Sequence, residues 1–219
     1  MKILFIGGSL NQTSMMHKIS LRLSDHACYF TPYYADGFIR LLVKFGILKN
    51  TILGGRHFRD TLEYLQDKNL PIDLRGDSQM YDLVVTGSDA IIQKNISKGR
   101  IMLVQEGMTE PESLTFYLVR LFKLPRWLAN TATTGISNAY DAFCVASDGY
   151  KDLFVKKGVY PEKIVVTGIP NFDNLADIPE TDFPYKNHVL VATTPFRETM
   201  RPELRPLFIR KCVEIANGR

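Results

Sequence analysis

The chain has 219 residues, which is enough for one sizeable core, or for one core and part of another. Hydrophobic residues make up 45% and charged residues 23% of the sequence, as in ordinary globular proteins, and 27 basic against 23 acidic residues give a net charge of +4. This mildly basic balance suits a phosphate-bearing ligand or an anionic membrane surface. It excludes the strongly basic composition of a nucleic-acid-binding protein.

The cysteines and the apolar runs indicate a compartment. Cys28, Cys144 and Cys212 are scattered and form no CxxC pair, which favours reduced, buried thiols. The start of the chain lacks the long apolar region of a signal peptide, and no stretch of about 18 uncharged apolar residues could form a transmembrane helix. The sequence therefore predicts a cytoplasmic protein without a transmembrane segment, and leaves contact with a membrane surface open.

Apolar runs alternate with helical patterns along the chain. Runs typical of strands cover 2–6, 28–34, 81–86, 100–105, 142–147 and 163–168. They are continuous, as in strands covered on both faces. Between them, Ser14 is predicted to cap a helix over 15–24, helical spacing predicts helices over 36–46, 56–67 and 113–124, and a further helix begins at Asp148 and ends at Gly158. This alternation predicts an α/β fold, a Rossmann-like parallel sheet with helices on both faces.

The composition changes after the sixth run. Residues 169–187 hold three prolines and several small polar residues, which is typical of a linker. Another strand and helix follow over 188–219, too little for an independent core. We therefore expect a first domain over 1–168, a linker over 169–187, and the first strand and helix of an incomplete second domain over 188–219, so that the chain is a fragment.

The first strand ends in the loop Gly7-Gly8-Ser9. Glycines let a backbone approach a ligand closely, and the start of a helix favours an anion, so this loop is a candidate ligand contact. The loop lacks the spacing of a dinucleotide-binding GxGxxG motif. A tight turn between strand and helix explains the glycines equally well.

Carboxylates follow two other predicted strands. Ser88 and Asp89 end the strand over 81–86, where Asp89 could bind a sugar hydroxyl, act as a base, or simply cap the next segment. Glu106 ends the strand over 100–105 beside a glycine, which suits proton transfer or hydroxyl binding. Of the three nearby glutamates we favour Glu106. Glu110 and Glu112 lie a few residues further on, and Glu110, which precedes a proline, is better explained by the start of the following helix.

The remaining candidates lie near the end of the chain. Thr194 and Arg197 follow the strand predicted to open the second domain, where Arg197 could bind a phosphate or could be a solvated arginine beside Glu198. The four histidines share no spacing typical of a metal site, so no metal is expected.

Four segments resemble a known superfamily: VVTGSD (84–89), VQEG (104–107), PEKIVVTGIPNFDN (161–174) and HVLVATTPFRET (188–199). Together they resemble the amino-terminal half of the GT-B superfamily, in the branch of UDP-N-acetylglucosamine 2-epimerases and related glycosyltransferases. The resemblance implies two Rossmann-like domains that face each other across a cleft, with the nucleotide held mostly by the second. This chain would then be the acceptor or sugar side.

The resemblance also implies roles for single residues. Asp89 matches an aspartate of the epimerases, and Glu106 matches the glutamate of their V-E-A-G turn. Two further acid–base groups of the epimerases are missing here, because the aligned stretches read RWLAN (126–130) and ATTPFRET (192–199). Proton removal and return at a sugar carbon needs such groups.

We therefore expect a glycosyltransferase of cell-surface glycan synthesis that uses a UDP-linked sugar and a glycan or lipid-linked acceptor. Glu106 is the expected base, with Asp89 second, and no cofactor is expected. The alternatives are a UDP-N-acetylglucosamine 2-epimerase with altered catalytic groups and a non-catalytic α/β binding domain.

Overall fold

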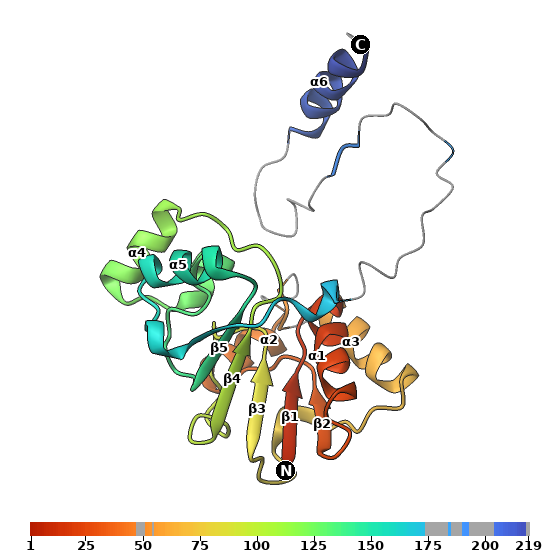
Figure 1. The fold of residues 1–219 in the computed structure, drawn as a ribbon, viewed down its shortest axis with the longest axis vertical. Helices are drawn as coiled ribbons and strands as arrows, with labels where there is room; N and C mark the ends of the chain where they lie inside the picture. The colour runs from red at the N-terminus through yellow and green to blue at the C-terminus, as the bar shows by residue number, and fades with distance from the viewer. Residues whose placement is uncertain (47–50, 54, 174–183, 185–189, 193–203, 218–219) are drawn as a thin grey trace. The chain divides into compact units, whose positions relative to one another are not determined.

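The computed structural model describes residues 1–46, 51–53, 55–173, 184, 190–192 and 204–217. The chain divides into two units, Met1–Leu175 and Ala176–Arg219. In the first unit, six parallel strands form one sheet in the order β2-β1-β3-β4-β5-β6 (Figure 1). The strands are β1 (Lys2–Ile6), β2 (Ala27–Thr31), β3 (Leu83–Thr86), β4 (Arg100–Val104), β5 (Ala142–Val145) and β6 (Ile164–Val166). The predicted α/β class and its six strands are confirmed.

Five helices of the described residues connect these strands, and a sixth lies in the second unit. They are α1 (Leu10–Leu21), α2 (Gly37–Lys44), α3 (Gly55–Asp67), α4 (Leu114–Phe122), α5 (Asp148–Lys157) and α6 (Arg205–Asn217). Short 3₁₀ turns are η1 (Leu74–Gly76), η2 (Arg126–Thr133), η3 (Pro161–Lys163) and η4 (Pro170–Phe172). β1, β3, β4 and β5 are each followed by a crossover to an adjacent parallel strand, as parallel pairing requires, whereas the connection after β2 passes β1 to reach β3.

Two cores lie on the two faces of the sheet. Successive side chains of a strand point to opposite faces, so β1 places Ile3 and Phe5 in one core and Leu4 in the other. The first core includes Met16 of α1, and the second includes Phe154 of α5; all five side chains are buried. Helices therefore cover both faces, which explains why the strands read as continuous apolar runs.

Helix α1 begins earlier than the sequence predicts. Ser9 caps it, because the Ser9 Oγ accepts a hydrogen bond from the Gln12 backbone N–H at 3.1 Å. The predicted cap, Ser14, lies inside the helix and donates its hydroxyl to the Asn11 carbonyl. The prediction was wrong because the first turn is polar and carries no helical apolar spacing.

Helix α5 confirms its predicted start at Asp148 and its predicted end at Gly158. Gly158 adopts the left-handed conformation (φ 104°) that ends a helix. The cap is Ser147, whose Oγ accepts from the Tyr150 N–H, and Asp148 lies in the first turn, where its charge suits the helix dipole.

The first unit extends beyond the boundary predicted at residue 168. Ile169 is buried in the core on the α1 side of the sheet, and η4 packs against α1. Within the second unit, residues 190–192 are irregular, so they do not show the predicted strand, whereas α6 confirms the predicted helix. Most of the predicted linker lies outside the described residues, and the domain division remains a prediction. In the described part of the chain, every helix is too short or too polar to cross a membrane.

Candidate functional site

The strand order changes direction beside β1. β1 pairs with β2 on one side and with β3 on the other. The chain therefore places β2 on one side of β1 and then crosses to place β3 on the other side. In open parallel sheets the crevice outside the carboxyl ends of such strands is where ligands bind. The loops Gly7–Ser9 and Gly87–Asp89 leave β1 and β3 here, and Glu106 follows β4, the next strand along.

Three side chains donate hydrogen bonds to the carboxylate of Glu106. Its Oε1 accepts from the Ser9 hydroxyl at 3.0 Å and from the Asn11 amide at 2.8 Å, and its Oε2 accepts from the Gln12 amide at 2.6 Å. A carboxylate offers about four lone-pair positions, so Oε1 is saturated and Oε2 keeps one. Glu106 is half-buried. The cluster holds one carboxylate in a fixed orientation, and the contacts of the described residues leave a single lone-pair position to accept a proton.

Two glycines make room for Gln12. A Cβ at Gly8 would lie 1.9 Å from the Gln12 Oε1, and a Cβ at Gly87 would lie 3.3 Å from the Gln12 side-chain carbons. The Gln12 side chain therefore passes close to the loops after β1 and β3 on its way to Glu106. The strand ends carrying Gly8, Gly87 and Glu106 therefore meet at one rim. The lack of a side chain at Gly7 likewise makes room for α1, because a Cβ at Gly7 would lie 2.6 Å from the Thr13 hydroxyl.

The segment after β6 joins the same cluster. The Asn171 amide donates to the Asn11 Oδ1 at 2.8 Å and to the Asn11 carbonyl at 3.2 Å. Because Asn11 in turn donates to Glu106, two amides form a chain that ends at the carboxylate. The Asn171 Oδ1 is buried and has no partner among the described residues.

Asp89 holds two loops together. It is 1% exposed, and its carboxylate accepts from the Gly135 N–H at 2.8 Å and the Ser137 N–H at 3.1 Å. Its carbonyl accepts from the Arg126 guanidinium at 2.9 Å. The alternative that Asp89 caps a helix is wrong, because the residues that follow it are irregular. Burial and two backbone donors suit Asp89 to positioning, so Glu106 is left as the better candidate for proton transfer.

Ser88 belongs to the turn that leads into Asp89. Its Oγ accepts from the Ala90 N–H at 3.4 Å, and the Tyr33 hydroxyl lies 3.5 Å from it. Tyr33 also donates to the Ile91 carbonyl at 3.1 Å. Burial raises the pKa of Tyr33 to about 12. These contacts fix the loop after β3, and the expected contact of Ser88 with a substrate remains a prediction.

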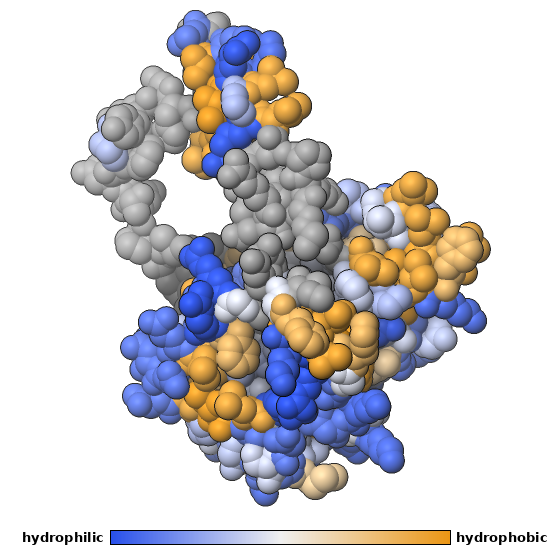
Figure 2. Space-filling model, turned by 180° about the vertical axis from the view of Figure 1, so that it is seen from behind, coloured by the Kyte–Doolittle hydropathy of each residue, from blue (hydrophilic) through white to orange (hydrophobic). Residues whose placement is uncertain are grey.

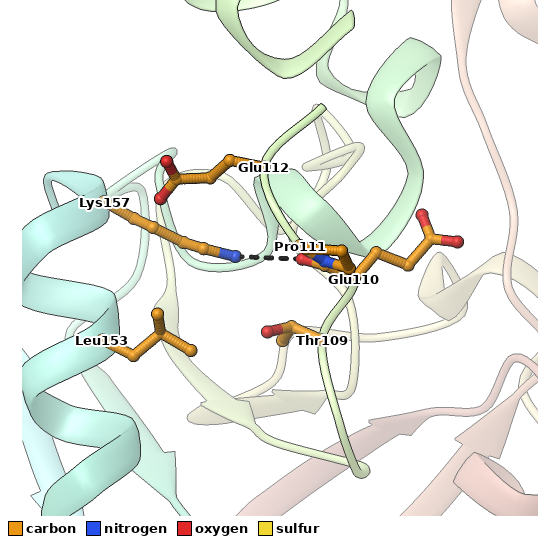
Figure 3. Close-up of a pocket in the computed structure, with 6 residues that line it drawn as sticks. All are labelled: Thr109, Glu110, Pro111, Glu112, Leu153 and Lys157. Carbon is orange, nitrogen blue, oxygen red and sulfur yellow. Dashed lines mark hydrogen bonds between the residues drawn. The ribbon is translucent and has the colours of Figure 1, made fainter. Parts of the chain in front are cut away.

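A hollow of about 370 Å³ lies in the connection between β4 and α4 (Figure 3). Lys157 reaches into it from α5 and donates to the carbonyls of Glu110 and Ala132, each at 3.3 Å. Burial lowers the pKa of Lys157, and the nearby charge of Glu112 opposes that shift. The ammonium also lies 5.9 Å from the Phe116 ring. Lys157 therefore ties the connection to α5 through two of its three N–H donors.

The two other glutamates do not join the cluster around Glu106. Helix α4 begins at Leu114, so Glu110 and Glu112 precede its first turn, and the expectation that Glu110 belongs to the start of this helix is not met. Glu112 accepts from the Tyr117 hydroxyl at 2.8 Å. Thr194 and Arg197 lie outside the described residues. Within the described ranges, no group of histidine, cysteine or acidic side chains could hold a metal ion.

Sequence reasoning missed Asn11, Gln12 and Asn171. The available signal was the short separation in sequence between Gly8 and the polar residues that follow it. The first turn of a helix after β1 faces the crevice at the strand ends. Reading the helix start at Ser9 would have placed Asn11 and Gln12 at the rim. Asn171 joins them over a separation of 160 residues, which no local pattern reveals.

Comparison with protein-family models gives no match, and comparison with curated protein sequences gives none either. Among solved structures, the chain is similar to HepE from Anabaena, which was crystallised in complex with UDP and glucose. The TM-score is 0.41 and the sequence identity 14%, and the similarity covers 77% of this chain. It covers 44% of the HepE chain, so this sequence spans less than half of that protein.

Proposed function

We propose that this chain is the acceptor-side half of a GT-B-type enzyme that transfers a glycosyl group from a nucleotide sugar, UDP-linked, to a hydroxyl group of a glycan or lipid-linked acceptor. One observation supports this most: Glu106 lies at the strand ends beside the point where the sheet order reverses, held by three donors with one lone pair free. A positioned carboxylate of this kind is what an inverting transfer needs near its acceptor.

The proposed step uses Glu106 as a general base. The acceptor oxygen attacks the anomeric carbon while its proton moves to the Glu106 Oε2, and the bond between the anomeric carbon and the diphosphate oxygen breaks. The nucleoside diphosphate leaves with that electron pair. Ser9, Asn11 and Gln12 keep the carboxylate oriented, and Asp89 keeps the loop after β3 in place. The nucleotide would be held mostly by the second half of the enzyme.

Release of UDP by the full-length natural protein tests this proposal. UDP-linked sugars are supplied with and without saccharide acceptors, and the wild type is compared with Glu106→Gln. The amide has nearly the shape of the carboxylate, and a rotated Gln12 amide restores the hydrogen bond, so the fold should survive. Loss of a general base should lower the transfer rate by about 10²–10⁴-fold.

Glu112→Gln is the matched control, because it removes an exposed carboxylate from the same connection and should leave transfer unchanged. Equal rates for the wild type and Glu106→Gln would remove Glu106 from the proposal. Conversion of the sugar to its 2-epimer without acceptor would instead indicate an epimerase. If no UDP-linked sugar turns over, a binding domain is the better explanation.

A further inference from the structure

Helix α4 carries two apolar stripes, and only one of them is buried. Phe116 and Val119 pack into a small core with η2. A second stripe has helical spacing and faces outward; its residues are Leu114, Tyr117, Leu118, Leu121 and Phe122. Leu121 is 74% exposed and Phe122 is 63% exposed. Figure 2 shows hydrophobic residues gathered over α4, at the right of the view. A contiguous exposed apolar surface of this kind marks an interaction site.

Leu124 and Leu128 extend this surface beyond the end of the helix, and both are exposed. The seven residues of the stripe and its extension are called the α4 surface below.

The charges in this segment are all positive. Between Glu112 and Asp141 the sequence contains Arg120, Lys123 and Arg126 and no acidic residue. Arg120 on α4 and Lys123, at the cap position that ends this helix, are exposed, and neither forms an ion pair with a described residue. The nearest acid, Glu112, precedes the helix and accepts the Tyr117 hydroxyl. Exposed leucines and aromatic rings beside unpaired cations are typical of helices that lie in the headgroup region of anionic lipids.

We propose that the α4 surface binds the surface of an anionic lipid bilayer. A second copy of the chain fits less well, because a symmetric contact through α4 would bring Arg120 and Lys123 of both copies together. An anionic bilayer supplies the opposite charge and also accepts the apolar side chains. The helix would lie in the plane of the interface without spanning it, consistent with its nine residues.

The position of α4 gives this contact a use. Its cap position, Ser113, is seven positions after Glu106 in the connection that leaves β4. Binding through α4 would keep the crevice at the strand ends near the lipid headgroups. Membrane binding itself does not depend on the proposed transferase activity, so either proposal can fail without the other.

Sedimentation with lipid vesicles tests the proposal. The protein is mixed with vesicles of equal parts phosphatidylcholine and phosphatidylglycerol, or of phosphatidylcholine alone. The wild type should bind the anionic vesicles more tightly. Arg120→Gln combined with Lys123→Gln should weaken that binding by about thirty-fold, since each cation near an anionic surface contributes about fivefold, and should change binding to neutral vesicles little.

Leu121→Ser combined with Phe122→Ser should weaken binding to anionic vesicles by at least about tenfold, because the apolar area is lost. The matched control is Leu21→Ser combined with Met80→Ser, which removes exposed apolar side chains away from α4 and should bind like the wild type. Because all four side chains are exposed, circular dichroism should show the same unfolding midpoint for every variant.

Two results would overturn the proposal. One is a wild type that binds neither kind of vesicle. This result overturns the proposal even if ultracentrifugation shows that the α4 surface instead forms a dimer, which Leu121→Ser with Phe122→Ser dissociates. The other is loss of vesicle binding through Phe38→Ser with Phe45→Ser, exposed residues of and beside α2, while the α4 variants still bind.

Discussion

Replacing Asp89 with asparagine should destabilise the first unit without acting on the chemistry directly. The carboxylate of Asp89 accepts from two backbone N–H groups, of Gly135 and Ser137, in a site that is 1% exposed. Asparagine has one carbonyl oxygen, so its amide nitrogen must face one of these two donors. That donor would then be buried without a partner.

The size of the effect follows from these contacts. Leaving one buried donor unpaired costs about 1–3 kcal/mol, and the remaining bond loses the strength that the charge gave it. We expect a total near 3 kcal/mol and a fall in Tm of about 6–12 °C for a chain of this size. Urea and thermal unfolding, followed by circular dichroism, measure both quantities.

Asp152→Asn is the control, because Asp152 is an exposed acid on α5 and its change should alter stability by less than about 0.5 kcal/mol. A stability of Asp89→Asn within about 1 kcal/mol of the wild type would refute the role of Asp89 as a link between loops. Loss of transfer activity in fully folded Asp89→Asn protein would instead return Asp89 to the reacting groups.

Three further substitutions test the site and the fold. Gly8→Ala should push away the Gln12 amide and lower the transfer rate about tenfold with little loss of stability. Gly107→Ala is the control: an added methyl there meets nothing within 4 Å, so the transfer rate should equal that of the wild type. Gly135→Ala should cost about 2–4 kcal/mol in urea unfolding, because Gly135 has φ +82° and its Cβ would lie 2.7 Å from a ring carbon of Phe143; a smaller loss would contradict the close packing. Tyr33 keeps its proton to a pKa of about 12 when folded and ionises near 10 when unfolded, so stability should fall as pH rises between these values. Tyr33→Phe should remove about 1.4 kcal/mol per pH unit from that slope in urea titrations, and an unchanged slope would show that Tyr33 does not titrate in this way.

The inner strands were predictable because they are buried on both faces of the sheet. Residues 3–6, for example, are all apolar and buried, and that pattern survives errors of a residue or two at the ends of the strand. The start of α1 was not predictable in the same way, since Asn11 and Gln12 face a polar cluster instead of a core.

The site was only partly predictable for a related reason. Glu106 could be chosen because a carboxylate directly follows a buried strand, and the ends of parallel strands share a rim. The partners of Asp89 could not, because Gly135 and Ser137 lie 46 and 48 residues away in an irregular segment. Long-range pairing of this kind leaves no periodic trace in a sequence.

The hydroxyl of Ser9 takes part in two separate structures. It accepts the N–H that starts α1, and it donates its own proton to Glu106. Replacing Ser9 with a residue that cannot cap a helix, such as alanine, would therefore remove the hydrogen bond to the carboxylate and also weaken the helix that packs against the sheet. Only threonine offers the same hydroxyl at that position. Changes in specificity would have to arise from neighbouring residues, which leaves Asn11 and Asn171 as the positions where variation is least costly to folding.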